Sequence, residues 1–260
     1  GGFICIYTVG YMKGYHAHHK DVKDRQPFFF SMLFLFLAAM FGLVLSQNLV
    51  WIYFFWEITS VISFLMIGYT KTDEAVNNSF CALWMNLLGG LGFAVAIALM
   101  ANLHGTLQLL EVVNIGALLP LMCLSLAGLT KSAQLPFSTW LLGAMVAPTP
   151  SSALLHSATM VKAGVYLLIR ISPALEGNLV GIIVSSIGGL TFIMASMMAI
   201  AQNDAKKVLA FSTISNLGLI VACSGIGVEE TVWAAVFLMI FHAVSKSMLF
   251  QSVGATENTL

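Results

Sequence analysis

Charged residues are scarce in this sequence, and their scarcity excludes a water-soluble fold. Only 8% of the 260 residues are Asp, Glu, Lys or Arg, while 59% are hydrophobic, and the mean hydropathy is +0.92. A soluble globular domain carries about 25% charged residues, which cover the surface that faces water. The 11 basic and 11 acidic residues balance, so no charge excess indicates a nucleic-acid partner. The composition predicts an integral membrane protein.

Cysteine is also rare and has no metal-site spacing. The four cysteines lie far apart, without a CxxC or CxxH pattern, which argues against an iron–sulfur cluster, a structural zinc site or a disulfide framework. We therefore expect no cofactor and no metal in this chain. The sequence begins at Gly1 inside an apolar stretch and has no signal peptide. We expect it to be a fragment that the parent protein extends on both sides.

Apolar stretches long enough to cross a bilayer recur along the whole chain. A membrane-spanning helix needs about 20 mainly apolar residues, and residues 1–12 resemble the end of a preceding span. We predict an all-α polytopic membrane helix bundle of about 8 spans, with 1–260 as one integral membrane domain. The spans lie near 27–46, 49–69, 78–101, 116–141, 151–172, 178–200, 205–226 and 231–253.

Basic residues gather on one side of the predicted bundle. Cytoplasmic loops carry an excess of Lys and Arg, so we expect a multi-pass protein of the prokaryotic plasma membrane with loop 11–26 in the cytoplasm. Within this loop, Tyr15–His16–Ala17–His18–His19 could bind a metal, but a polar loop explains the run without one. Only Arg170 lies on the other side, against Lys13, Lys20, Lys23, Arg25, Lys71, Lys206 and Lys207.

The remaining lysines, Lys131, Lys162 and Lys246, lie inside predicted spans, as does Glu57. A charge at the bilayer centre costs about 2.5–3.5 kcal/mol, and such residues mark ion pathways. A lysine can instead snorkel to the interface, and this alternative stays open for Lys131 and Lys246. Glu57 and Lys162 lie near the middle of their predicted spans, and a carboxylate is too short to snorkel.

Two histidines accompany these charges. His242 and Lys246 are four residues apart, on one helix face. His156 and Lys162 are six apart, about 9 Å along a helix axis, which suits a relay between neighbouring helices. Each histidine could instead be only a hydrogen-bond partner between helices. Titratable lysines and histidines, rather than a cage of oxygen ligands, favour protons over sodium as the transported ion.

The segment after Lys131 predicts a broken helix. Pro136 removes a backbone donor and disfavours helix at Leu135, so we expect helix 116–141 to break just after its lysine. Broken helices at membrane depth line watery cavities and mark binding sites in transporters. By contrast, Gly89–Gly90–Leu91–Gly92 is typical of close helix packing.

In their order along the chain, five motifs resemble the antiporter-like membrane subunits shared by respiratory complex I, energy-converting (group 4) hydrogenases and multisubunit sodium/proton antiporters. The resemblance covers essentially the whole sequence, and the motif sequences are most similar to those of the large membrane subunit of the hydrogenases. The motifs are Phe55–Trp56–Glu57, Lys131–Ser132–Ala133–Gln134–Leu135–Pro136, Ala147–Pro148–Thr149–Pro150 leading into 155–164, Asp204–Ala205–Lys206–Lys207 with 208–213, and Phe241–His242–Ala243–Val244–Ser245–Lys246.

The resemblance implies inverted five-helix repeats, each with a broken helix. Residues 27–172 would form the first repeat, and residues 178–253 the first part of the second. One departure concerns the segment after the lysine, where the family reads Pro-Phe-His-x-Trp-Leu-Pro. This chain reads Pro136–Phe137–Ser138–Thr139–Trp140–Leu141–Leu142, which leaves open the conformation past the break and proton entry through that histidine.

The resemblance also implies a function: a proton-translocating subunit of a redox-driven complex, either a complex I-like NADH:quinone oxidoreductase or an energy-converting hydrogenase. Glu57 and Lys131 would form the ion pair of one half-channel. At an effective dielectric of about 20, moving the carboxylate from about 4 to about 8 Å weakens the attraction by about 2 kcal/mol, which would let Lys131 release its proton. The onward relay would consist of His156, Lys162, His242 and Lys246.

Because we expect no redox centre here, the partners would be other membrane subunits and a peripheral redox module, besides the lipid bilayer and protons or sodium ions. Whether the chain belongs to an enzyme stays open. One alternative is a subunit of a stand-alone sodium/proton antiporter without redox partners. Another is a structural subunit that transports nothing and whose buried charges merely pair.

Overall fold

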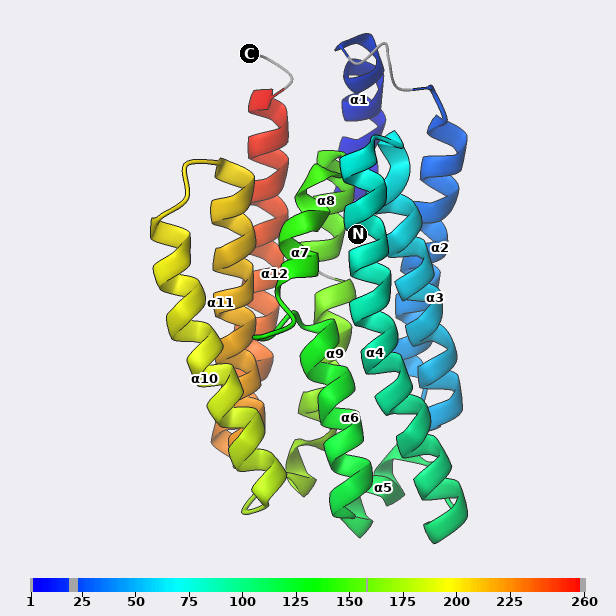
Figure 1. The fold of residues 1–260 in the computed structure, drawn as a ribbon, viewed down its shortest axis with the longest axis vertical. Coiled ribbons are helices and arrows are strands. Elements are labelled where there is room, and N and C mark those ends of the chain that lie inside the picture. The colour runs from blue at the N-terminus through cyan, green and yellow to red at the C-terminus, as the bar shows by residue number, and fades with distance from the viewer. Residues whose placement is uncertain (1, 19–22, 158, 258–260) are drawn as a thin grey trace.

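The computed structural model describes residues 2–18, 23–157 and 159–257, which form one bundle of helices (Figure 1). Within these ranges there is no β-strand, and one isolated bridge joins Asn48 to Gln108. Seven helical segments of the described chain are long and apolar enough to cross a membrane, and one shorter apolar helix joins them. The prediction of an all-α membrane helix bundle is confirmed.

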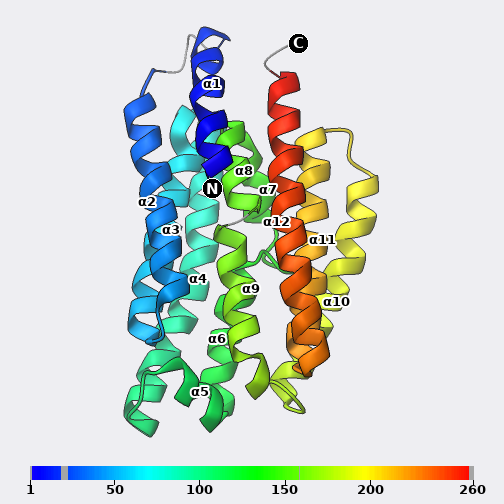
Figure 2. The same ribbon diagram turned by 180° about the vertical axis from the view of Figure 1, so that it is seen from behind.

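Six long helices alternate in direction along the bundle, and shorter helices lie in its centre and at both of its ends (Figures 1 and 2). The long helices are α2 (Gln26–Leu45), α3 (Leu49–Ile67), α4 (Asp73–His104), α10 (Leu179–Ile200), α11 (Ala205–Ile226) and α12 (Glu229–Glu257). The shorter ones are α1 (Gly2–His18), α5 (Leu109–Ile115), α6 (Leu118–Lys131), α7 (Thr139–Gly143), α8 (Thr149–Ser157) and α9 (Met160–Ile171), with 3-10 turns η1 (Gly68–Thr70), η2 (Ala144–Val146) and η3 (Ser172–Ala174).

Side-chain caps fix where several of these helices begin. The Asn48 side chain accepts a hydrogen bond from Val50 N at the start of α3, and Asp204 accepts from Lys206 N at the start of α11. Thr72 Oγ1 accepts from Ala75 N at 3.2 Å, so α4 begins at Asp73 rather than near 78. Such caps satisfy backbone amides that the first turn leaves without partners.

The N-terminal part of the predicted loop 11–26 is helical, because α1 continues to His18. Stacked rings support this extension, with the Tyr11 and Tyr15 centroids 5.8 Å apart. His19 and Lys20 lie outside the described residues, so the expectation that the histidine run binds no metal stays a prediction.

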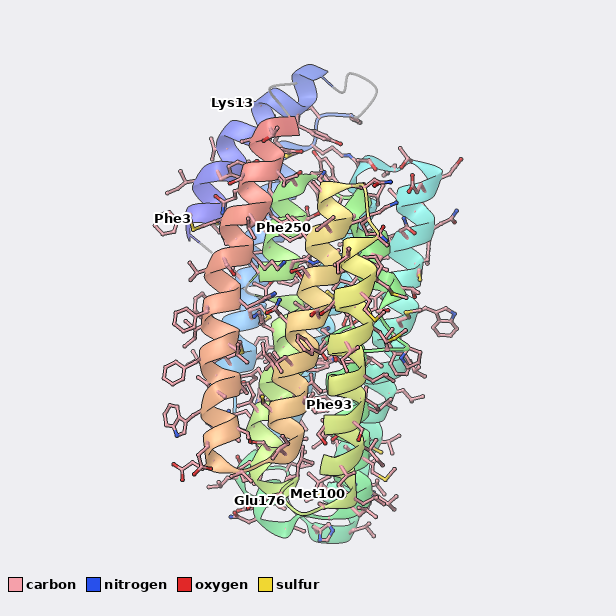
Figure 3. All side chains as sticks on the ribbon, turned by 90° about the vertical axis from the view of Figure 1, so that its left-hand side faces the viewer. Phe3, Lys13, Phe93, Met100, Glu176 and Phe250 are labelled. Carbon is pink, nitrogen blue, oxygen red and sulfur yellow. The ribbon has the colours of Figure 1, made fainter. Side chains whose placement is uncertain are left out.

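The described basic residues outside the spans lie at one end of the bundle, apart from Arg170. Figure 3 shows Lys13 at this end and Glu176 at the other, and α2, α4 and α11 all begin at the Lys13 end (Figure 1). We call it the basic end. Its place in the cytoplasm stays a prediction, as does the division into two inverted repeats.

Two predicted spans are interrupted. In place of the predicted helix 116–141, the structure has α6, which ends at Lys131, and α7, which begins at Thr139. The break after Lys131 was predicted from Pro136. The sequence predicts a continuous span over 151–172, but α8 ends at Ser157 and α9 begins at Met160. At Thr159 the backbone leaves helical geometry (φ −128°, ψ −97°). The Thr159 hydroxyl donates to the Leu154 carbonyl at 2.6 Å, so a side chain uses a backbone acceptor near the end of α8.

Glycines let the helices approach closely. A β-carbon at Gly188 of α10 would lie 2.5 Å from the Ala222 backbone nitrogen of α11, and Gly218 is similarly close to α10. In the Gly89–Gly92 run, a β-carbon at position 92 would lie 3.1 Å from the Cys123 carbonyl of α6. The predicted role of this run in close helix packing is confirmed.

Candidate ion path

The end of α6 is a buried helix terminus at the centre of the bundle. Lys131 is its last residue, and the chain then turns through Ala133, which has a positive φ of 53°. Trp140 Nε1 donates to the Thr130 carbonyl at 3.1 Å, and Leu135 N donates to Thr191 Oγ1 of α10 at 3.1 Å. Side chains therefore replace the backbone partners that the break removes, while the negative end of the α6 dipole lies beside the lysine.

The Lys131 ammonium group is held by α3. The side chain is 0% exposed, and Nζ donates to the Trp56 carbonyl at 3.0 Å and to Ser60 Oγ at 2.6 Å. We call these two acceptors the Lys131 seat. Nζ also lies 4.9 Å from the centroid of the Trp56 ring, a distance at which an aromatic face attracts a cation. Lys131 therefore does not snorkel to an interface.

Glu57 follows Trp56 on α3 but does not pair with the lysine. Within the described residues, no ion pair joins the two, and the buried Glu57 Oε1 has no hydrogen-bond partner. The carboxylate packs on α4 against Gly90, where a β-carbon would collide with Oε1. The hypothetical ion pair between Glu57 and Lys131 is thus not formed in this structure, and the ammonium group is bound to α3 instead.

Lys162 lies at a second helix end. Because α9 begins at Met160, Lys162 is in the first turn of α9 rather than near the middle of a span, which corrects its predicted place. His156 and Lys162 therefore belong to two helices, and the 9 Å spacing along one axis does not apply. Lys162 is 4% exposed, and Nζ donates to the Met239 carbonyl of α12 at 3.0 Å.

One face of α12 connects the remaining candidate residues. Met239, His242 and Lys246 follow at spacings of three and four, so they share a face, and Phe250 continues it. The His156 ring of α8 lies 4.9 Å from the Phe250 ring, centroid to centroid. Figure 2 shows α12 running beside α8 and α9. This face thus meets Lys162 at one level and His156 at another.

Lys246 has a seat of the same kind as Lys131. It is 3% exposed, and Nζ donates to the Leu209 carbonyl at 3.2 Å and to Ser212 Oγ at 2.8 Å, both on α11. In each seat, one carbonyl and one serine hydroxyl of a neighbouring helix bind the ammonium group. Lys246 therefore does not snorkel either. The seats differ in that Glu57 adjoins the first, whereas Ala210 has the matching position after Leu209 in the second.

Both histidines are buried without partners in the described part of the chain. His156 is 0% exposed and His242 is 5% exposed, and all four ring nitrogens lack a hydrogen-bond partner. The alternative that each is a hydrogen-bond partner between helices is therefore not supported. The Ser151 and Ser152 hydroxyls of α8 are likewise buried without partners.

Sequence reasoning missed the groups that bind the lysines. Ser60 lies three residues after Glu57, on the same face of α3, so this spacing is a usable signal. Ser212 belongs to one of the recognised motifs but has no charge to attract attention. The carbonyls of Trp56, Leu209 and Met239 have no sequence signal, because every residue carries one.

No described group of three or more His, Cys, Asp or Glu side chains could hold a metal ion. The described site therefore consists of buried amines, imidazoles, hydroxyls and one carboxylate. Such groups can accept and release protons one after another without covalent chemistry.

Comparison with known proteins finds antiporter subunits. A probable K(+)/H(+) antiporter subunit of Rhizobium meliloti is 39% identical over 264 residues, which cover 97% of this chain and 26% of that protein. A putative antiporter subunit of Staphylococcus aureus, mnhA2, is 39% identical over 281 residues, covering 98% of this chain and 35% of that protein. The chain thus spans between about a quarter and about a third of the length of these curated relatives.

Two solved structures share the fold, and a family description matches the sequence. The Mrp complex from Dietzia sp. DQ12-45-1b aligns with a TM-score of 0.84 at 38% identity, covering 87% of this chain and 26% of that one. The membrane-bound sulfane sulfur reductase, an archaeal respiratory membrane complex, aligns with a TM-score of 0.82 at 26% identity, covering 88% and 49%. Because residues 46–259 match the family described as NADH:quinone oxidoreductase/Mrp antiporter, TM, the chain belongs to this family of antiporter-like membrane subunits.

Proposed function

We propose that the parent protein translocates protons as an antiporter-like subunit of a multisubunit cation/proton antiporter. The observation that supports this most is the series of three buried lysines, each bound to a helix other than its own. A buried charge is costly unless it is bound or functional. Here it is bound by neutral oxygens, which leave each amine free to gain or lose its proton.

The proposed path follows the packing of the helices that carry the candidate residues, with α6 against α9 and with α12 against α8 and α9. Protons would pass from Glu57 and Lys131 to Lys162, and then along the α12 face through His242 to Lys246 and His156. The unpartnered histidine nitrogens and the α8 serine hydroxyls would be bridged by water, because buried polar groups nearly always have a partner. The Ser151 and Ser152 hydroxyls lie on α8 between His156 and the basic end, so they offer protons a connection between His156 and that end which does not need the histidine that Ser138 replaces.

The antiporter assignment is supported by the names of the relatives, two of which are antiporter subunits with 39% identity. A redox-driven complex is the second candidate, and the resemblance to the archaeal respiratory complex favours it. In either case the partners would be other membrane subunits, and a peripheral redox module would be needed only in the second.

One purification separates these two functions. The full-length parent protein, extracted in mild detergent, would be assayed for copurifying nickel, flavin, and hydrogenase or NADH-oxidising activity, and then reconstituted into vesicles. The antiporter proposal predicts exchange of sodium or potassium for protons without any redox substrate. Copurifying redox activity, with proton movement only when its substrate is supplied, would contradict the antiporter proposal and support the second candidate.

Ser60, the serine of the Lys131 seat, provides a further test. Ser60→Ala is expected to slow exchange by about tenfold, since a hydrogen bond to a charged group contributes about 1.5–3 kcal/mol and its loss shifts Lys131 from the seat toward Glu57. Ser60→Thr keeps the hydroxyl and should retain most of the rate. Ser63 is the matched control, because it is buried on the same helix but bonds to Met160 Sδ and the Thr59 carbonyl. Equal rates in Ser60→Ala and the parent would contradict the role of the seat.

A further inference from the structure

A cavity at the basic end of the bundle is lined by none of the candidate ion-path residues. It occupies about 380 Å³ between the start of α2, the end of α3 with η1, and the start of α4. Its walls combine two cations with a largely apolar floor. The lining residues are Arg25, Phe28, Phe64, Leu65, Gly68, Tyr69, Lys71, Val76, Ser79 and Phe80.

The two cations are only partly used by the protein. One terminal nitrogen of Arg25 donates to the Tyr69 carbonyl at 3.0 Å, and the guanidinium lies 5.6 Å from the Tyr69 ring centroid. The Arg25 Nε is buried without a partner. The Lys71 side chain is exposed and makes no ion pair or hydrogen bond within the described residues. An anion in the cavity would therefore meet unused donors from two segments.

The depth of the lining residues matches an amphiphile. Arg25 directly precedes α2, and Lys71 caps η1, so both lie at the level where the spans end. Phe28, Phe64 and Phe80 lie about one to two turns further toward the middle of the membrane, by their positions in α2, α3 and α4. The cations are thus at headgroup level, and the aromatic rings are at the level of the acyl chains.

The local charge balance argues for a lipid rather than a free anion. Asp24 adjoins Arg25, and Asp73 and Glu74 occupy the first turn of α4, although none of the three lines the cavity. These carboxylates offset the attraction that Arg25 and Lys71 exert on an anion in solution. A lipid gains in addition the burial of its acyl chain against the aromatic floor, at about 25 cal/mol per Å².

We propose that this cavity binds an anionic phospholipid, with its phosphate between Arg25 and Lys71 and the upper part of an acyl chain along Phe28, Phe64 and Phe80. Basic pockets between helices near a membrane surface are suited to anionic headgroups. The site anchors the junction of α2, α3 and α4 in the leaflet at the basic end. It does not depend on the proposed ion transport.

Native mass spectrometry of the full-length parent protein in detergent tests this site, with phosphatidylglycerol or phosphatidylcholine added. The parent is expected to retain phosphatidylglycerol in preference to phosphatidylcholine. Lys71→Asn should weaken phosphatidylglycerol binding by about fivefold, because one basic residue near the headgroup contributes a factor of about that size. Asparagine also suits the left-handed backbone at this position (φ 58°), and the Lys71 side chain has no partner to lose among the described residues. Arg25→Gln should add a similar loss.

The control removes two other charges at the same end. Lys206 and Lys207 begin α11 outside the cavity, so the double substitution to glutamine should leave phosphatidylglycerol binding as in the parent. Unchanged binding in Lys71→Asn and Arg25→Gln would overturn the proposal, as would equal retention of both lipids. Displacement of the lipid by millimolar inorganic phosphate would also overturn it, because the site would then select a free anion.

Discussion

Replacing Lys131 with alanine in the intact parent protein is expected to abolish cation/proton exchange while leaving the protein folded and assembled. The reason is that Lys131 is the only titratable group at the end of α6, and the path has no described bypass from Glu57 to α9. The seat should tolerate the loss, because Ser60 Oγ also bonds to the Trp56 carbonyl, at 3.2 Å. Because no carboxylate is bound to the Lys131 ammonium group, removing this group leaves no negative charge without its partner.

Exchange in vesicles and elution of the assembled complex on a sizing column would be measured together. Lys131→Met is the matched variant, because it fills the volume of the lysine and separates lost titration from a cavity, which alone costs about 2–5 kcal/mol in a core. Both variants should elute as the parent and exchange no cations. Exchange at the parent rate in either one would show that protons do not pass through Lys131.

Gly164→Ala is expected to damage stability and transport together. Gly164 lies where α9 crosses the end of α6, and a β-carbon there would lie 2.5 Å from the Gly128 carbonyl and 2.7 Å from the Ser132 nitrogen. Both are backbone atoms, so the helices must separate, at a cost of about 1–3 kcal/mol. The displaced helix end carries Lys131 away from Ser60.

Thermal unfolding in detergent and exchange in vesicles check this prediction. Gly189→Ala is the control, because a β-carbon at Gly189 of α10 would meet no atom within 4 Å. We expect a lower melting temperature and slow exchange for Gly164→Ala alone. A parent-like melting temperature for this variant would mean that the close approach of α6 and α9 is not needed.

The sequence predicted those features of the fold that have a local cause. The apolar runs locate the membrane helices, and α11 covers residues 205–226 as expected. Pro136 predicts the break after Lys131 because it removes a backbone donor. The interruption before Met160 was missed, since no proline or glycine marks it. The Ser157 and Thr159 hydroxyls bond to carbonyls within α8 at this point, but serines and threonines make the same kind of bond inside intact helices.

The candidate residues were predictable, but their contacts were not. A charge inside an apolar run is visible in the sequence, so Glu57, Lys131, Lys162 and Lys246 could be named. Which helix receives each ammonium group depends on packing between helices far apart in the chain. The bond from Lys246 to Ser212 is one example, and the separation of Glu57 from Lys131 is another. Local patterns contain no information on either.

In the proposed function, Glu57 and Lys131 carry protons and are not only structural charges. The most direct test is cation-driven proton uptake into vesicles containing the intact parent complex with Glu57→Gln and Lys131→Met combined. Removing both charges leaves no buried charge unpaired, so a purely structural pair could be replaced without loss. We expect an assembled complex with no proton uptake, as in Lys131→Met alone. Uptake at the parent rate would contradict it.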